Sequence, residues 1–500
     1  MEGFEGKAAP AMADGMSEAI RRGVLDEFQA LCRIPHQSGH EEAVSQYLYD
    51  RLRALTETVV RDEYCNVVAD IKATAGWETV PVVALQAHSD MVVAVKNAEE
   101  FDPEKDEVHT VVEGNILRTD GRSSLGADNG VGIAAVLHML EQKDLPHGPL
   151  KIIFTSGEEV GLKGARLMEA GVLDGVRYLI NLDGFHSDRA IVGCMGGKRE
   201  VFRHPITWEE TNDEFIGVHM EVSGMLGGHS GEDIGLGRCN AIRMISELLL
   251  MLWDKGFRMK IAKMEGGEGA NVIPRSCKVH LAVAKNRLGK FYTECEKSYR
   301  YLVGGYEKTE ETPHFEYITR PVPAKAWTKE TAEDVLETIL GENNGVYAMS
   351  KEFRGCIGAS SNLGQVTTEE NEVVIRSMIR CESGELEQKL LDQHQHEAED
   401  HHFSVAVTGY NAWHQNADNP LTHAVEDAYM EIKHQPITVT IAPVGLEPAC
   451  FQEKAPWLSI VTLGADIRDA HATTERVKID SMETMYRMIT GVLEKIGSAK

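Results

Sequence analysis

Two histidines and five carboxylates stand in five short segments of this chain, and all are side chains that can bind divalent metal ions. They are His88 and Asp90 in LQAHSDMV, Asp128 in LGADNGVGIA, Glu158 and Glu159 in FTSGEEVGLKG, Asp183 in NLDG and His471 in DAHATTERV. Imidazoles and carboxylates without thiolates suit Zn²⁺, Mn²⁺ or Co²⁺, and such a set can hold two ions with one shared ligand. Because bound divalent ions lower the pKa of water towards 7, the set indicates hydrolytic chemistry.

Each motif taken alone has an ordinary structural explanation. Asp128 stands where a turn or a helix N-cap would place a carboxylate, and Glu158–Glu159 suits the first turn of a helix. Asp183 is harder to explain in this way, because it follows the apolar run YLINL and an unpaired buried carboxylate is costly. It is the joint occurrence of the motifs, in this order, that predicts a metal site.

Apolar runs precede most of these side chains and predict how they are positioned. Residues 80–87, 150–155 and 178–182 are nearly continuous apolar runs, which are typical of strands buried on both faces. Residues 130–142 and 162–170 lie between them and have helical spacing. This alternation indicates βαβ units and a mostly parallel sheet. Because ligands of such sheets bind at the carboxyl ends of the strands, we expect the distant acids to converge there.

The pattern changes between about residues 190 and 410. Two rounds of similar strand and helix order predict an inserted, duplicated α+β domain, and the α/β pattern returns after it. Because His471 must rejoin the site of the first half, we expect a discontinuous catalytic domain. The predicted fold is therefore α/β with an inserted lid. Its parts are a flexible tail at 1–15, a catalytic domain at 16–190 and 411–500, and a lid or dimerisation-type domain at 191–410.

Composition narrows the partners and the compartment. The net charge of −27 argues against nucleic-acid and anionic-membrane partners. No apolar run reaches the ~18 residues that a membrane span needs, and the N-terminus lacks the order of a signal peptide. The nine cysteines include no C-x-x-C pair, which suits a reducing compartment. We therefore expect a cytoplasmic protein without nucleic-acid or membrane partners.

The motifs together resemble those of the M20 family of metallopeptidases, and within it the aminoacyl-histidine dipeptidase branch. The matching segments span nearly the whole chain: PHQSGHEE (35–42), LQAHSDMV (85–92), LGADNGVGIA (125–134), SGEEVGLKG (156–164), NLD (181–183), GGHSGEDIGLGRCNA (227–241), NVIPRS (271–276), SSNLG (360–364), GLEPACF (445–451) and HATTERV (471–477). The ADNG form of the Asp128 motif and the long insert favour this branch over the shorter deacylases.

The resemblance implies a role for each metal-site residue. His88 and Asp183 would hold one ion, Glu159 and His471 the other, and Asp128 would bridge both. Glu158 would be the general base for a metal-bridging water, and Asp90 would orient His88. The expected cofactor is two divalent ions, with zinc favoured over manganese and cobalt. Family members often have a cis peptide after the bridging aspartate, here between Asp128 and Asn129.

The resemblance also points to residues of the insert. His229 in GGHSG would help to polarise the scissile carbonyl, although a Gly-rich surface loop is the plainer explanation. The remaining substrate-binding candidates are Asn271, Ser360, Ser361, Asn362, Arg376 and Glu447. Arg376 suits a substrate carboxylate through its fork of donors, or is an ordinary strand residue. Glu447 would either pair with a substrate amine or cap a helix.

We therefore expect hydrolysis of short peptides, above all dipeptides with a free N-terminus such as Xaa-His and β-alanyl-His. The alternatives are an M20-type deacylase of N-acyl amino acids and a noncatalytic peptide-binding homologue, which the retention of Glu158 disfavours. The chain departs from the family pattern at Phe185, Pro443 and 410–416, where substrate choice would be affected. The insert would either form a homodimer contact or, through its duplication, replace that contact within one chain.

Overall fold

The computed structural model describes residues 11–414 and 416–498, which form two compact units of mixed α/β structure, as predicted. Unit 1 comprises Met1–Gly193, Trp413–Ile441 and Leu446–Lys500, and unit 2 comprises Cys194–Ala412 and Ala442–Gly445. Of the tail expected at 1–15, residues 1–10 lie outside the described part. Residues 11–15 are helical, because helix α1 spans Ala11–Cys32.

Unit 1 is built on an eight-stranded sheet. Its strands are, in spatial order, β1 (Val59–Arg61), β2 (Val67–Ile71), β6 (Leu150–Thr155), β3 (Val82–His88), β7 (Val176–Gly184), β23 (Ser459–Gly464), β8 (Arg189–Cys194) and β22 (Thr438–Ala442). Strands β6, β3, β7 and β23 pair in parallel, and β1, β2 and β8 add antiparallel neighbours. The apolar runs predicted from sequence are thus the parallel centre of the sheet.

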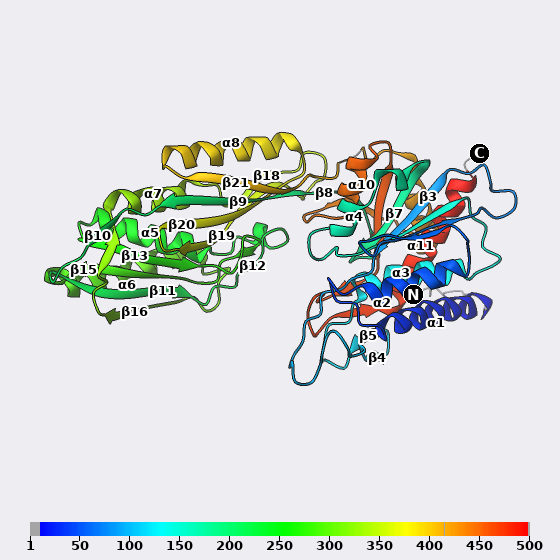
Figure 1. Ribbon diagram of the computed structural model, residues 1–500, viewed down its shortest axis with the longest axis horizontal. Coiled ribbons are helices and arrows are strands. Elements are labelled where there is room, and N and C mark those ends of the chain that lie inside the picture. The colour runs from blue at the N-terminus through cyan, green and yellow to red at the C-terminus, as the bar shows by residue number, and fades with distance from the viewer. Residues whose placement is uncertain (1–10, 415, 499–500) are drawn as a thin grey trace, which may run out of the picture. The chain divides into compact units, whose positions relative to one another are not determined.

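Helices lie on both sides of this sheet (Figure 1). They are α1, α2 (Glu42–Arg53), α3 (Ala127–Leu140), α4 (Lys163–Leu167), α9 (Pro420–Lys433), α10 (Pro448–Lys454) and α11 (Ile479–Ser498). Helix α3 contacts β3 and β7, while α9, α10 and α11 contact β23. Nearly all of α3 is buried, which explains why its sequence is apolar on every face. None of the helices in the described part of the chain is long and apolar enough to cross a membrane.

A small antiparallel sheet adds the last structural piece of unit 1. Its order is β24 (Ile467–Arg468), β25 (Arg476–Lys478), β5 (Ile116–Thr119) and β4 (Thr110–Glu113). Strands β24 and β25 form a hairpin, and the loop between them carries His471 and Glu475.

Unit 2 contains a nine-stranded sheet. Along its main path lie β16 (His314–Arg320), β11 (Phe215–Ser223), β15 (Cys277–Ala284), β13 (Met259–Gly266), β19 (Ile357–Thr368), β20 (Glu372–Cys381), β9 (Gly196–Pro205) and β21 (Ser404–Tyr410). The ninth strand, β18 (Gly345–Met349), pairs with β19. An apolar core that includes Leu248, Phe291 and Trp327 lies between this sheet and the helices α5 (Ala241–Asp254), α6 (Leu288–Val303) and α7 (Lys329–Gly341).

The topology of unit 2 repeats itself. One half runs β11, α5, β13, β15, α6, β16, and the other runs β9, α7, β19, β20, α8 (Gly384–Asp400), β21. In the sheet the two halves appear in mirrored order, with the edge strands β16 and β21 at the two ends and β13 beside β19 in the middle. This arrangement agrees with the duplicated insert that the sequence predicts.

Candidate metal centre

The predicted ligands of unit 1 lie at the carboxyl ends of its central strands or directly after them. His88 is the last residue of β3, Asp183 is near the end of β7, and Glu158 and Glu159 follow β6. Asp128 stands in the first turn of α3, and the peptide bond from Asp128 to Asn129 is cis, as the resemblance implied. Parallel pairing brings these strand ends to one edge of the sheet.

Four side chains form a continuous chain of contacts. His88 Nε2 lies 2.9 Å from Asp128 Oδ1, and the second oxygen of Asp128 lies 3.1 Å from His471 Nε2. That same nitrogen is 2.7 Å from Glu159 Oε1. Ligand atoms of His88, Asp128 and Glu159 all lie within 4.8 Å of one another. Asp183 Oδ1 is 3.5 Å from His88 Nε2. The structure therefore brings all five predicted ligands together, with Asp128 between the two imidazoles.

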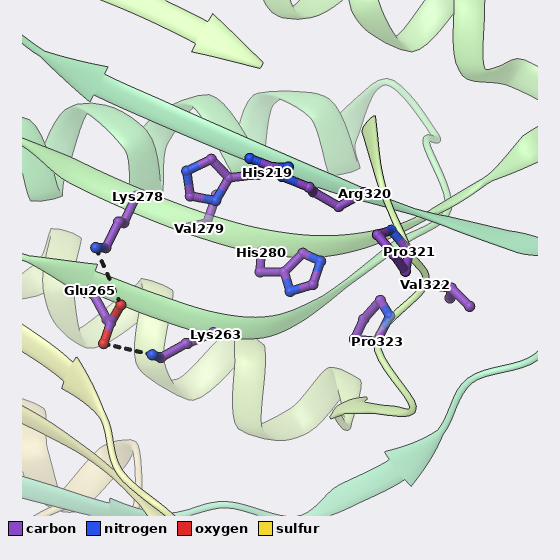
Figure 2. Close-up of a pocket in the computed structure, with 10 residues that line it drawn as sticks. All are labelled: His219, Lys263, Glu265, Lys278, Val279, His280, Arg320, Pro321, Val322 and Pro323. Atoms are coloured by element: carbon purple, nitrogen blue, oxygen red, sulfur yellow. Dashed lines mark ion pairs between the residues drawn. The ribbon is translucent and has the colours of Figure 1, made fainter. Parts of the chain in front are cut away.

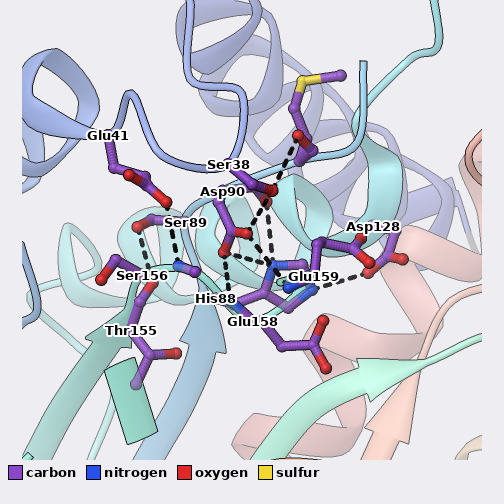
Figure 3. Close-up of polar contacts among 12 residues, drawn as sticks. Ser38, Glu41, His88, Ser89, Asp90, Asp128, Thr155, Ser156, Glu158 and Glu159 are labelled. Carbon is purple, nitrogen blue, oxygen red and sulfur yellow. Dashed lines mark hydrogen bonds and ion pairs between the residues drawn. The ribbon is translucent and has the colours of Figure 1, made fainter. Parts of the chain in front are cut away.

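Asp90 fixes the segment that carries the two glutamates (Figure 3). Its carboxylate accepts hydrogen bonds from the backbone N–H of Glu158 at 2.9 Å, from that of Glu159 at 3.3 Å and from Ser38 Oγ at 2.7 Å. Its Oδ1 also lies 3.5 Å from His88 Nδ1. The hydrogen bond of His88 Nδ1 goes to the backbone carbonyl of Asp90 at 3.0 Å, while the Asp90 carboxylate holds the loop that follows β6.

This cluster contains more carboxylates than positively charged groups, which favours the binding of a cation. Carboxylates of Asp128, Asp183, Glu158 and Glu159 face two imidazoles, and no Lys or Arg of the described residues pairs with them. Burial and the nearby charge of Asp128 together raise the pKa of Asp183 to about 8, against the opposing effect of His88. Burial also raises the pKa of Glu159. An excess of buried carboxylate oxygens with two imidazoles is a donor set that fits divalent ions.

The two imidazoles respond in the opposite direction. Burial alone would lower the pKa of His88, but hydrogen bonds to Asp128 and Asp183 outweigh it and hold that pKa well above the usual value. For His471 the bonds to Asp128 and Glu159 likewise outweigh burial and raise the pKa to about 11. Without a metal ion, each histidine is therefore protonated, and its imidazolium supplies the positive charge between the carboxylates.

Glu158 differs from its neighbour. Burial raises the pKa of Glu158 well above its usual value, the charge of His88 opposes this, and Asp183 and Glu159 add to it. Among the described residues no hydrogen bond to its carboxylate is formed. A carboxylate with a raised pKa and unengaged oxygens is suited to take up and release a proton.

Glu475 is a part of the cluster that the sequence did not single out. Its buried carboxylate accepts four backbone N–H groups from the segment that leads to Asp128. Its place four residues after His471 is the only sequence signal that could have pointed to it.

In unit 2, His229 accepts two backbone N–H groups through one ring nitrogen. It lies in β12 (Gly228–His229), which pairs with β14 (Val272–Ile273). Its Nδ1 accepts the backbone N–H of Gly231 at 3.2 Å and that of Glu232 at 3.3 Å. Burial and the charge of Arg380 lower the pKa of His229 to about 4. The neutral ring therefore carries its proton on Nε2, where it can donate to an acceptor.

Arg380 is the second residue that the sequence did not reveal. It is buried, with Nη2 at 3.5 Å from His229 Nε2, Nε at 3.4 Å from Ser230 Oγ and Nη1 at 3.3 Å from Tyr410 Oη. No carboxylate of the part of the chain that the structure describes pairs with it. Because a buried guanidinium without an anion is unfavourable, Arg380 and His229 together form a donor pair suited to an anionic ligand.

Three of the other predicted residues of unit 2 lie in β19, beside the segment that contains Asn271. Ser360, Ser361 and Asn362 are buried in β19, and the Asn362 amide donates to the carbonyls of Ala270 and Val272 on either side of Asn271. The Asn271 carbonyl in turn accepts the N–H of Ser230 at 3.0 Å.

Arg376 does not join this group. It bonds Gln365 at 3.2 Å and Thr367 at 3.3 Å, and it lies 3.7 Å from Glu369. The structure thus places Arg380, rather than Arg376, beside His229.

Glu447 lies in the interior of unit 1. Its Oε2 accepts hydrogen bonds from Gln86 and Thr155, both at the carboxyl-terminal half of their strands, and its Oε1 has no partner among the described residues. Burial raises its pKa to about 7. It is the N-cap residue of α10, although its side chain makes no capping hydrogen bond.

The three departures from the family pattern have different surroundings. The carbonyl of Pro443 would lie 2.6 Å from a Cβ at Gly231, so Pro443 packs against the loop of His229. In the segment 410–416, Tyr410 contacts Arg380, while Gln415 lies outside the described residues. Phe185 is half-buried directly after β7.

A hollow of about 500 Å³ on the sheet of unit 2 is lined by none of the predicted residues (Figure 2). Its walls are His219, Lys263, Glu265, Lys278, Val279, His280, Arg320, Pro321, Val322 and Pro323. Glu265 pairs with Lys263 at 2.8 Å and with Lys278 at 3.6 Å. With three permanent cations and one carboxylate, this hollow differs in charge from the acidic ligand set of unit 1.

Comparison with known proteins gives consistent results. The model of Peptidase family M20/M25/M40 matches residues 84–495. The cytosol non-specific dipeptidase of Escherichia coli (strain K12) is 28% identical over 484 residues, covering 96% of this chain and 99% of the relative. The crystal structure of aminoacylhistidine dipeptidase from Vibrio alginolyticus is similar with a TM-score of 0.81 and 30% identity, covering 94% and 96% of the two chains. A tripeptidase from Staphylococcus aureus subsp. aureus Mu50 shares the fold, with a TM-score of 0.57, 16% identity and coverage of 95% and 98%.

Proposed function

The chain belongs to peptidase family M20/M25/M40 and is a metallopeptidase, and from that premise we propose that it hydrolyses dipeptides with a free N-terminus. The observation that carries this proposal is the contact chain His88–Asp128–His471–Glu159, with the unengaged Glu158 carboxylate next to it in sequence. The relatives from Escherichia coli and Vibrio alginolyticus, which are 28% and 30% identical to this chain, are both dipeptidases by name, and this supports the choice of substrate length.

Five residues would hold two divalent ions. We propose His88, Asp128, Glu159, Asp183 and His471 as the ligands, with Asp128 shared. Its two oxygens already face different imidazoles, which supports this role. When bound, such ions supply Lewis acidity for the scissile carbonyl and lower the pKa of water. Zinc is our first choice because imidazole and carboxylate ligands suit it, with manganese and cobalt as alternatives.

The protein's own groups then move the protons. Glu158 takes a proton from the attacking water and returns it to the leaving amine, a role that its raised pKa supports. Asp90 keeps the backbone of Glu158 and Glu159 in place during this exchange. Unit 1 is thus proposed to be the catalytic domain, and unit 2 the lid.

Residues of unit 2 are proposed to bind the substrate. His229 would donate its Nε2 proton to the scissile carbonyl oxygen, and its fixed tautomer supports this. Arg380 would bind the C-terminal carboxylate, because its buried guanidinium lacks an acidic partner in the described chain. We further propose a cytoplasmic location, in keeping with the cysteine content and with the cytosolic name of the relative from Escherichia coli.

A substrate panel tests the proposal. Protein stripped of metal and reconstituted with Zn²⁺, Mn²⁺ or Co²⁺ is offered Xaa-His peptides, β-alanyl-His, other dipeptides, tripeptides and N-acetyl amino acids. We expect hydrolysis of dipeptides, Xaa-His among them, only after reconstitution. Faster hydrolysis of N-acetyl amino acids than of any dipeptide would favour the deacylase alternative, and a lack of turnover on the whole panel would contradict both.

A further inference from the structure

A single buried carboxylate holds the backbone of the segment that ends at Asp128. Oε2 of Glu475 accepts the N–H of Leu125 at 2.8 Å and that of Gly126 at 3.1 Å. Oε1 accepts the N–H of Ala127 at 2.9 Å and that of Asp128 at 3.4 Å. Four successive amides therefore point at one carboxylate that comes from a distant part of the chain.

This segment has a particular need for an acceptor. The N–H groups of residues 125–128 have no partner within a helix, because α3 begins at Ala127 and its residues Asp128 and Asn129 have non-helical backbone angles. Its N-cap residue is Gly126 with φ of 72°, which has no side chain that could accept them. A negative charge at a helix N-terminus is also favoured by the helix dipole. Glu475, from a distant part of the chain, supplies the hydrogen-bond acceptor that the residues around Gly126 do not.

The same loop holds Asp128 at a second point. His471 lies in the loop between β24 and β25, four residues before Glu475, and its Nε2 is 3.1 Å from Asp128 Oδ2. The side chain of His471 is 43% exposed, so packing alone does not fix it. Glu475, by contrast, is 2% exposed. The same loop thus contacts the Asp128 side chain through His471 and the backbone of residues 125–128 through Glu475.

We propose that Glu475 is a positioning residue of the metal centre, which sets the direction of the Asp128 carboxylate between His88 and His471. The inference rests on the proposed function, because it assigns Asp128 as the shared ligand. Glu475 acts through the backbone of 125–128 and does not itself contact either imidazole in the contacts described.

The chemistry of the contact explains why a carboxylate stands there. Glutamine has the same shape but only one acceptor oxygen, so its NH₂ group would face two of the four amides. Those amides would then be buried without a partner, and the backbone that carries Asp128 would be expected to shift. Groups that orient a metal ligand typically change metal affinity by about 10- to 100-fold when they are altered.

The test compares Glu475→Gln with a matched control. Glu310 in unit 2 is also a buried carboxylate that accepts two backbone amides, those of Leu226 at 2.7 Å and Cys239 at 2.8 Å. Affinities for Zn²⁺ and Co²⁺ are measured by competition with a chelator, and the visible spectrum of the Co²⁺ form is recorded. We expect Glu475→Gln to lose at least about tenfold in affinity with an altered spectrum, and Glu310→Gln to match wild type in both.

Thermal unfolding of the metal-free proteins separates positioning from general stability. A positioning role predicts a metal-free Tm close to wild type together with lower metal affinity. Wild-type affinity and spectrum in Glu475→Gln would overturn the inference, even if peptide hydrolysis is confirmed. If wild type binds metal but cleaves no peptide, the proposed function is contradicted. The positioning role of Glu475 is then still decided by the metal affinities and the Co²⁺ spectra. If wild type binds neither ion, both are overturned.

Hydrogen exchange of the wild type decides the case in which Glu475→Gln does not fold. In metal-free protein the amides of residues 125–128 should exchange slowly, because Glu475 accepts all four. Exchange at the rate of an open loop would overturn the inference.

Discussion

Glu158 and Glu159 are adjacent, yet only the Glu159 carboxylate has a partner among the described residues. Glu159 contacts His471 at 2.7 Å, whereas the Glu158 carboxylate is unengaged within the described chain. We predict that Glu158→Gln lowers kcat by about 10²-fold or more and leaves metal content unchanged, because it removes a base and no ligand. Glu159→Gln should instead lower metal occupancy. Both quantities are measured on the same preparation, and near-normal turnover of Glu158→Gln would contradict the assignment.

A second prediction compares two arginines of the same strand. Arg376 and Arg380 both lie on β20, but only Arg380 is buried beside His229 and free of an acidic partner in the described residues. We predict that Arg380→Ala lowers kcat/KM for dipeptides by about 10²-fold or more, because a charge-assisted pair with the substrate carboxylate is lost. Arg376→Ala should remain within a few-fold of wild type. Equal effects of the two substitutions would show that Arg380 has no special role.

These two sites show what sequence can reveal about single residues. The proximity of the proposed metal ligands could be predicted because their types are distinctive and because His88, Asp183 and the two glutamates lie at the ends of apolar strand runs or shortly after them. The sequence does not favour Arg380 over Arg376, since residues four apart on a strand lie on the same face. Only the pairing of β20 with β19 and the position of the His229 loop show which arginine lies beside His229. Glu475 was not singled out for another reason, because its partners are backbone amides and only its place four residues after His471 could have pointed to it.

At the end of helix α7, the buried side chain of Glu342 makes the free energy of unfolding depend on pH. Glu342 follows the last residue of α7, and neither of its carboxylate oxygens has a partner in the described chain. Burial raises the pKa of Glu342 to about 8, although the charge of His394 opposes the shift. Above pH 4.5 the unfolded chain releases this proton while the folded chain keeps it, so stability is lost as pH rises towards 8.

We therefore predict that Glu342→Gln stabilises the protein near neutral pH. Glutamine needs no proton, so the gain should be small at pH 4.5 and grow to about 3 kcal/mol at pH 7. Thermal unfolding at several pH values measures it. Glu330→Gln, at an exposed position in the first turn of the same helix, is the control and should show little pH dependence. A Glu342→Gln variant that is less stable than wild type at pH 7 would show that the folded protein ionises this carboxylate.

At the level of elements, sequence predicted helices and apolar strands better than polar strands. The helix predicted at 130–142 corresponds to α3, and β3, β6 and β7 could be predicted because both faces of each strand are buried. Strands β9 and β19 were not predicted, because glycines and polar residues fill positions that the sheet nevertheless buries. In β19 the buried residues Ser360, Ser361 and Asn362 give no apolar alternation. Tertiary pairing, rather than local preference, determines such strands.

For the whole molecule, the repeat in unit 2 bears on assembly. His229 belongs to the half that begins with β11, and Arg380 belongs to the half that begins with β9, yet the two side chains meet within one chain. We therefore predict that specific activity is constant over about three orders of magnitude in enzyme concentration, because no second chain is needed to join them. A fall in specific activity on dilution, with a matching change in size-exclusion volume, would contradict this and favour an obligate dimer.

The repeat also changes how the protein can evolve. When two identical chains form a symmetric pair, every substitution enters both copies at once. In this chain each copy is encoded separately, so a histidine can be kept in β12 without a counterpart in the other half, and an arginine in β20 likewise. Under the proposed function, in which His229 and Arg380 bind different parts of the dipeptide, each copy can specialise in one end of the ligand. Selectivity can thus be adjusted one end at a time, without an unwanted change at a symmetry-related position.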